Sequence, residues 1–242
     1  LFNQMLVDKG LQIIELKKVK TGNLKIILTG NGRVSRGAEE ILKQLNIKQV
    51  SKSDFLTKDF SSSVYTCLTA VDYYETLDSK SSSKDAIYKY PKKHKSCFSK
   101  YLFCSDMLIT GHFYDSNAPF LFTKTDIKNN KKLKVVADIS CDIDGPVACT
   151  IRPSKIISPI YGYNPISFKE DDYLKDHVIA VMAVDNLPCE LPKDASIYFG
   201  QELLQKVIPS FINDNDGIIK KGTITHNGVL TEKFKYLEDF IS

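Results

Sequence analysis

A glycine-rich loop between an apolar run and a helix-like run is the part of this sequence best suited to chemistry. Residues 25–45 read KIILTGNGRVSRGAEEILKQL, with Gly30 and Gly32 directly after the apolar run. In a dinucleotide-binding loop, one glycine permits a tight turn, a second lets backbone N–H groups approach a pyrophosphate, and a small residue lets the next helix lie close to the sheet. Ser35 takes the place of the usual third glycine, and Gly37 follows. The pattern favours dinucleotide binding over a helix-capping turn that holds no ligand.

The choice of nucleotide depends on the residues that end the second predicted strand, over residues 47–50. An acidic side chain there would bind the adenosine ribose 2′-hydroxyl and favour NAD. Instead the run continues into Ser51 and Lys52, and Asp54 comes late. A hydroxyl and a cation suit a 2′-phosphate, which makes Ser51 a predicted cofactor-binding residue and tilts the prediction toward NADP. Lys52 is equally typical of a solvated loop, so NAD and NADP both stay open.

Among the four histidines, His112 is the candidate for a place near the reacting centre. It follows a predicted strand that ends in Gly111, and the carboxyl ends of parallel strands face the ligand crevice. No carboxylate next to it in sequence would orient the ring, so a catalytic and a structural role both stay open. His94, in the basic stretch YPKKHKS, is predicted to be solvated, and His177 and His226 are predicted to be structural.

Two polar loops follow later predicted strands. The segment ADISCDIDGP carries three aspartates at or just beyond a strand end: Asp138, Asp142 and Asp144. Such carboxylates either position a substrate amine or ribose hydroxyls, or cap the loop backbone as Asx turns. The spacing lacks the closing glutamate of a calcium loop, and no metal site is predicted. The segment AVDNLPCELPKDAS, residues 183–196, either contacts the nicotinamide end of a cofactor or forms a rigid strand-to-helix connection.

The bulk composition limits the class of protein. The 242 residues are 43% hydrophobic and 26% charged, with a net charge of +4, which is typical of a soluble globular protein and too mild to imply nucleic acid. No apolar stretch approaches the length of about 18 residues that a membrane span needs, and no signal-peptide pattern opens the sequence. Six scattered cysteines without a CxxC pair are typical of reduced intracellular thiols, so we expect a cytoplasmic protein.

The elements that must position these residues alternate between strands and helices. Apolar runs predict buried strands over 24–29, 47–50, 64–71, 105–111, 132–140 and 177–184. Apolar residues at helical spacing predict a helix over 34–45, and a final helix is predicted over 192–212. The order indicates an α/β fold with a doubly wound, mostly parallel Rossmann-type sheet and helices on both faces. We expect one or two connecting helices over 1–20 and the domain itself over 21–242.

Several motifs, in this order, resemble one family. GNGRVSRGAEEIL, ITGHFYDSNAPFLFT, ADISCDIDGP and VDNLPCELPKDAS, with the closing THNGVLTEKFKYLEDF, are similar to the cofactor-binding portion of the lysine-forming saccharopine dehydrogenases. They equally resemble the lysine–ketoglutarate reductase half of the bifunctional lysine-degrading enzyme. Both belong to the alanine dehydrogenase and pyridine nucleotide transhydrogenase superfamily. The resemblance covers roughly residues 20 to 242.

The resemblance implies an NAD(P)-dependent oxidoreductase that transfers a hydride to or from the C–N bond of saccharopine, formed from lysine and 2-oxoglutarate. It implies that Asp142 is the acidic residue near the reacting centre. It also assigns cofactor-binding positions in three loops: Gly30, Gly32, Arg33, Val34, Ser35, Gly37, Gly111, His112, Phe113, Asp185, Asn186 and Leu187. Two departures from the family pattern are Ser35 in place of a glycine and DIDGP in place of a double glycine.

Imine reduction needs a proton donor within hydrogen-bond reach of the reacting atoms. In the family that this sequence resembles, the acid–base lysine and histidine and the carboxylate-binding arginines are features of a separate N-terminal domain, which has no counterpart here. We therefore expect a missing N-terminal catalytic domain, joined through residues 1–20, and a chain that is inactive alone. An alanine dehydrogenase-like amino-acid dehydrogenase and a non-catalytic nucleotide-binding module stay open as alternatives, as does a homo-oligomer. No nucleic-acid or membrane partner is expected.

Overall fold

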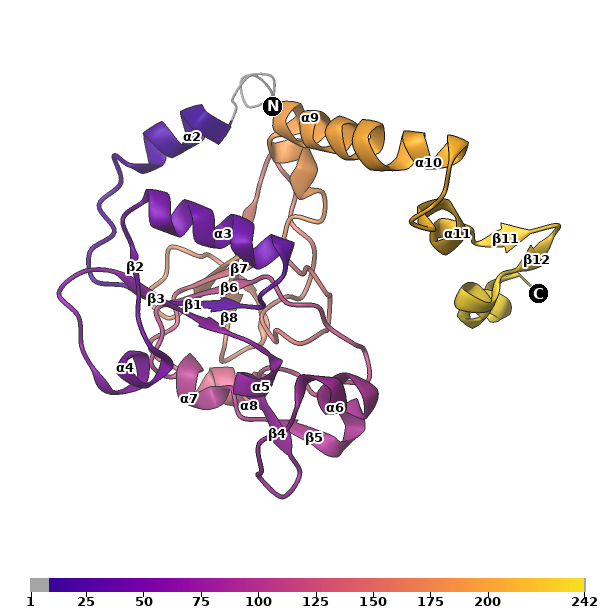
Figure 1. Ribbon diagram of the computed structural model, residues 1–242. Helices are drawn as coiled ribbons and strands as arrows, with labels where there is room; N and C mark the ends of the chain where they lie inside the picture. Colours follow the sequence, from indigo (N-terminus) through magenta and orange to yellow (C-terminus); the bar gives the residue numbers. More distant parts are fainter. Residues whose placement is uncertain (1–8, 242) are drawn as a thin grey trace. The chain divides into compact units, whose positions relative to one another are not determined.

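The computed structural model describes residues 9–241. The chain forms two compact units, Leu1–Glu190 and Leu191–Ser242. The sequence predicts one domain over 21–242, whereas the structure groups the residues from Leu191 onward separately. The first unit carries the large sheet and the glycine-rich loop of residues 30–37 (Figure 1).

Within the described residues, the first unit is built on an eight-stranded sheet with the order β2-β3-β1-β6-β7-β10-β8-β9. Its strands are β1 (Lys25–Thr29), β2 (Lys48–Gln49), β3 (Val64–Leu68), β6 (Met107–Thr110), β7 (Val135–Asp138), β8 (Ile160–Asn164), β9 (Lys169–Asp171) and β10 (Ile179–Met182). The strands from β2 to β10 in this order pair in parallel. β8 pairs antiparallel with β10 on one side and with β9 on the other. The predicted mostly parallel α/β sheet is confirmed.

Helices cover both faces of this sheet. Consecutive side chains of a strand point to opposite faces, and β1 is apolar on both, so each face needs helices to bury it. On one face, Ile26 and Leu28 of β1 join a buried cluster with Leu42 of α3 (Arg33–Gln44). On the other face, Ile27 joins a larger cluster that includes Phe55 of α4. That second face is covered by α4 (Lys52–Thr57), α7 (Ser99–Leu102) and α8 (Lys124–Lys128) (Figure 1). The predicted arrangement of helices on both faces is confirmed.

The order of β2 and β3 in the sheet decides which residues lie beside the site. β3 pairs with β1, and β2 lies outside β3 at the edge of the sheet. The predicted buried strand over 47–50 shrinks to two exposed residues, because Lys48 and Gln49 offer no apolar side chain to bury. β3 is a longer and largely buried strand, so it takes the inner position. The residues that follow β3, and not those that follow β2, therefore border the crevice at β1.

A hairpin of β4 (Tyr74–Thr76) and β5 (His94–Ser96) projects after β3 and encloses α6 (Lys84–Lys89). The sequence predicts a solvated His94, and this prediction is wrong. The His94 ring is 6% exposed, with Nδ1 2.9 Å from the Tyr90 carbonyl oxygen and Nε2 2.8 Å from the Ser82 hydroxyl. The hairpin pairs the histidine strand with Tyr74–Thr76 and so turns the ring inward.

The remaining elements are shorter. They are α2 (Lys9–Leu16), α5 (Ala70–Tyr73), α9 (Pro192–Glu202), a π-helical segment (Leu203–Val207), α10 (Ile208–Ile212), α11 (Ile218–Gly222), the hairpin β11 (Thr225–His226) and β12 (Val229–Leu230), and 3₁₀ turns at Pro91–Lys93, Leu187–Glu190 and Glu232–Phe240. The final helix predicted over 192–212 is present and changes to π geometry at its centre. Of the predicted connecting helices over 1–20, α2 is described, and residues 1–8 lie outside the described residues.

Membrane-spanning helices, metal sites and disulfides are all absent from the described residues. Across residues 9–241, no helix has both the length and the apolar character needed to cross a bilayer. The same residues contain no group of three or more His, Cys, Asp or Glu side chains placed to hold a metal ion. The cysteines, all of them within this range, are free thiols.

Candidate functional site

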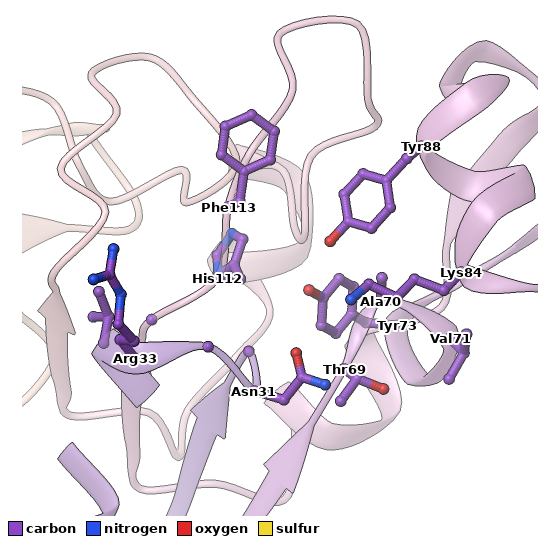
Figure 2. Close-up of a pocket in the computed structure, with 14 residues that line it drawn as sticks. Asn31, Arg33, Thr69, Ala70, Val71, Tyr73, Lys84, Tyr88, His112 and Phe113 are labelled. Carbon is purple, nitrogen blue, oxygen red and sulfur yellow. The ribbon is translucent and has the colours of Figure 1, made fainter. Parts of the chain in front are cut away.

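A pocket of about 530 Å³ lies at the carboxyl ends of β1, β3 and β6 (Figure 2). From β1 the chain continues into strands on one side, β2 and β3, and later into β6 and β7 on the other. Ligands of open α/β sheets bind at such a reversal, outside the carboxyl ends of the strands. The pocket is lined by Gly30, Asn31, Gly32, Arg33, Val34, Thr69, Ala70, Val71, Tyr73, Lys84, Tyr88, Gly111, His112 and Phe113.

Gly30 and Gly111 form the floor of the pocket, and Ser35 packs closely beneath them. Gly30 has a φ of +93°, and a Cβ there would lie 2.5 Å from the carbonyl oxygen of Gly111 and 2.5 Å from the Ser35 hydroxyl. The Ser35 hydroxyl donates to the carbonyl oxygens of Thr29 and Gly111, at 2.9 Å each. Ser35 is buried, so it does not line the pocket; it fastens the start of α3 to the ends of β1 and β6.

The start of α3 faces the pocket with its backbone amides. Gly32 is the N-cap, and within the described chain no side chain caps the helix and no acidic residue occupies its first turn. A Cβ on Gly32 would meet no described atom within 4 Å, so the space before the helix is open. The first amides of a helix have no partner inside the helix, and the helix dipole makes its N-terminus attractive to anions. This arrangement suits a phosphate group.

Thr69, Ala70 and Val71, which follow β3, line one side of the pocket. The next residue, Asp72, turns its carboxylate away: it accepts from the Thr69 amide at 2.7 Å and pairs with Lys52 at 2.5 Å. Among the described residues that line the pocket, none carries a carboxylate. The sequence analysis looked for ribose-binding residues after the second predicted strand, over 47–50, and assigned no role to Thr69–Val71. The apolar run over 64–71 was the available signal.

An aromatic and cationic wall completes the pocket. Tyr73 lies at a centroid distance of 5.9 Å from the ring of His112, in a T-shaped arrangement. Lys84 and Tyr88 extend from α6 toward the pocket, and the Lys84 ammonium lies 5.8 Å from the centre of the Tyr88 ring (Figure 2). Arg33 stands at the glycine loop, across the pocket from these residues (Figure 2). The pocket therefore offers two cations, one at each side.

His112 is held by Thr29 at the end of β1, whose hydroxyl oxygen lies 2.7 Å from Nδ1. Burial lowers the pKa of His112 to about 4, and the nearby charge of Asp138 only partly opposes this. The imidazole is therefore neutral near pH 7. A neutral imidazole still carries one N–H group, so His112 can donate a hydrogen bond to a ligand.

The aspartates of residues 137–146 form a separate polar cluster. The Asp138 carboxylate, 0% exposed, accepts from the hydroxyls of Thr110 at 2.5 Å, Ser140 at 2.6 Å and Thr150 at 2.5 Å. Asp142 is half-buried, and burial, followed by the charge of Asp138, raises the pKa of its carboxyl. Asp142 does not line the pocket, and its predicted place near a reacting centre stays a prediction.

The structure brings some predicted cofactor residues together and leaves others apart. Seven line the pocket: Gly30, Gly32, Arg33, Val34, Gly111, His112 and Phe113. Six do not. Ser35 lies beneath the floor, Gly37 is exposed on α3, and the Ser51 hydroxyl accepts from the Asp54 amide and caps α4. Asp185 and Asn186 are exposed and Leu187 is half-buried after β10. The binding roles of these residues stay predictions.

The family model described as the C-terminal domain of alanine dehydrogenase/PNT matches residues 10–233. The chain belongs to this family. The superfamily expected from the motifs is thereby confirmed. The chain is 27% identical to the mitochondrial alpha-aminoadipic semialdehyde synthase of Rattus norvegicus, over 97% of this chain and 29% of that protein.

A plant relative is likewise similar to most of this chain over a small part of its own length. The chain is 30% identical to the alpha-aminoadipic semialdehyde synthase of Arabidopsis thaliana, over 88% of this chain and 22% of that protein. The chain therefore spans less than a third of the length of these two relatives.

Proposed function

We propose that the chain is the NAD(P)-binding domain of an oxidoreductase of lysine degradation, of the saccharopine dehydrogenase and lysine–ketoglutarate reductase type. The observation that carries the proposal is the uncapped start of α3 at Gly32, which opens onto a pocket at the reversal point of the sheet. Membership of the alanine dehydrogenase/PNT family and the similarity to alpha-aminoadipic semialdehyde synthases support it.

The residues present fit a dinucleotide. A Cβ at Gly30 would fill the floor, while Gly32 leaves the space before α3 open for a pyrophosphate on the first amides of the helix. The adenosine half would lie over Thr69–Val71, and the nicotinamide half over Gly111–Phe113, on the other side of β1. A bound dinucleotide supplies or accepts the hydride; the chain binds and orients it.

The lining favours NADP(H) over NAD(H). An acidic residue at the end of the inner strand would bind the 2′-hydroxyl of NAD, and none of the described lining residues is acidic. Asp72, the nearest acid in sequence, is occupied by Thr69 and Lys52. Lys84 lies on the adenosine side, where an ammonium group attracts a 2′-phosphate.

The proton donor and the substrate-carboxylate groups are proposed to lie outside this chain in the whole protein. His112 is neutral near pH 7, and Asp142 is not among the residues of the pocket. The substrate, saccharopine or lysine with 2-oxoglutarate, would meet the nicotinamide at the open side of the crevice. The chain alone is expected to bind the cofactor without turnover.

Calorimetric titration of the chain with NADPH and with NADH tests the proposal. We expect binding with a Kd below about 1 mM, tighter for NADPH. An absence of heat with both at millimolar concentration would contradict it. In the full-length protein, oxidation of the reduced cofactor by lysine with 2-oxoglutarate is expected; oxidation by pyruvate with ammonia instead would favour an alanine dehydrogenase-like enzyme.

A further inference from the structure

One of the residues that line the pocket, His112, carries a buried polar atom without a partner. In the described part of the chain, two buried side-chain polar atoms lack a hydrogen-bond partner, Nε2 of His112 and the hydroxyl of Tyr163. Buried polar groups in native proteins are nearly always paired. His112 lines the dinucleotide pocket and Tyr163 does not, so a ligand of this pocket is the partner that suits His112.

The surroundings of Thr29 decide which ring nitrogen carries the proton. The Thr29 hydroxyl oxygen lies 2.7 Å from His112 Nδ1 and accepts a long hydrogen bond from the Gly111 amide at 3.4 Å. If Thr29 donates its proton to Nδ1, the Thr29 hydroxyl, Nδ1 and the Gly111 amide all have partners, and Nε2 carries the ring proton. If Nδ1 donates instead, the Thr29 proton has no acceptor among these groups. The first arrangement is therefore favoured, and Nε2–H is a donor without an acceptor.

The position of His112 in the fold says which part of a ligand it can reach. His112 follows Gly111 at the end of β6, and Gly111 packs against Gly30 and Ser35 under the glycine loop. β6 lies on the opposite side of β1 from β3, whose following residues, Thr69–Val71, border the adenosine side. His112 is therefore next to the part of the pocket that runs from the pyrophosphate toward the nicotinamide.

We propose that His112 Nε2–H donates a hydrogen bond to an oxygen on the nicotinamide half of the bound dinucleotide, its phosphate or its ribose hydroxyls. The proposal rests on the proposed function and adds a named donor atom to it. The donor is neutral, so it orients the nicotinamide half without adding charge to the site. Thr29 is the positioning residue, because its hydroxyl fixes the tautomer and the direction of the ring.

Two variants test the donor directly. His112→Leu removes it, while His112→Gln keeps an N–H group near the position of Nε2. By calorimetry we expect His112→Leu to weaken NADPH binding about tenfold, the size of one lost hydrogen bond, and His112→Gln to stay within about threefold of the wild type. Binding of 2′,5′-ADP, which contains only the adenosine half, is expected to stay unchanged in both variants.

The ligand series separates the possible outcomes. ADP-ribose, which adds the second phosphate and ribose, should lose the same affinity as NADPH in His112→Leu. Unchanged NADPH binding in that variant, or an equal loss for NADPH and 2′,5′-ADP, would overturn the proposal. A wild-type chain that binds neither ligand would instead overturn the proposed function.

Nitrogen-15 NMR of the wild-type chain gives a readout that does not depend on a variant. We expect the free chain to hold His112 as the neutral Nε2–H tautomer, and the Nε2 signals to shift when NADPH is added. His94 is the internal control, because both of its ring nitrogens already have partners and it does not line the pocket. A proton on Nδ1 of His112, or an unresponsive Nε2 with NADPH bound, would overturn the proposal.

Discussion

Two polar centres at the same edge of the sheet differ in how their hydrogen bonds are satisfied. The Asp138 carboxylate, after β7, is surrounded by donors from its own chain: three hydroxyls and the Cys141 amide. His112, after β6, has one ring nitrogen bound to Thr29 and one that no described group satisfies. The hydrogen bonds of Asp138 hold its own loops together, whereas His112 and the start of α3 are proposed to meet a ligand.

The difference distinguishes a residue that we expect to stabilise the fold from residues that we propose to bind the cofactor. A buried carboxylate with a full set of donors gains nothing from a ligand, while an open helix start and an unpaired buried donor do. Asp138 is predicted to matter for stability, and Gly32 and Lys84 for binding.

The largest effect is expected for Asp138→Ala. Removing the carboxylate leaves the hydroxyls of Thr110 and Thr150 buried without their acceptor. We expect the free energy of unfolding to fall by about 2–4 kcal/mol, measured by urea denaturation. A change below about 0.5 kcal/mol would show that Asp138 is not the structural centre that its hydrogen bonds indicate.

Gly32→Asp should affect binding and stability in opposite directions. The new carboxylate would occupy and repel the phosphate position, so we expect NADPH affinity to fall by about a hundredfold or more. Aspartate is a favourable N-cap, so the melting temperature of the chain should stay equal or rise.

Gln44→Asp is the matched control for this variant. Gln44 is exposed at the other end of α3, it does not line the pocket, and its replacement adds the same single negative charge. We expect its NADPH affinity to match that of the wild type. Unchanged binding in Gly32→Asp, or an equal loss in both variants, would discredit the loop assignment.

A smaller effect is expected for Lys84→Gln. Loss of one exposed cation on the adenosine side should weaken NADPH binding about fivefold and leave NADH binding unchanged. Lys89→Gln is the control, because Lys89 lies on the same helix, stacks on Tyr90 and does not line the pocket. Equal losses for NADPH and NADH in Lys84→Gln would mean that Lys84 does not recognise the 2′-phosphate.

Much of the fold follows from sequence pattern. The apolar runs that end in Thr29 and Thr110 and the helical spacing after Gly32 predict the centre of the sheet, because long buried runs leave little choice of position. The order of β2 and β3 did not follow, since strand order depends on which run buries more surface beside β1. The predicted cofactor role of Ser51 depended on that order.

Other parts of the site depend on long-range contacts that no local pattern contains. Lys84 and Tyr88 reach the pocket because the hairpin of β4 and β5 carries α6 to it. The hydrogen bond between Thr29 and His112 joins residues 83 positions apart. The burial that lowers the pKa of His112 likewise appears only in the folded chain.

The most direct test of the account is an amide NMR titration of the chain with NADPH. If the start of α3 binds the pyrophosphate, the N–H signals of Gly32, Arg33 and Val34 should shift the most, and saturate at the Kd found by calorimetry. Saturable binding that leaves these amides unmoved would contradict the account, because the dinucleotide would then bind somewhere other than the helix start that the glycine loop opens.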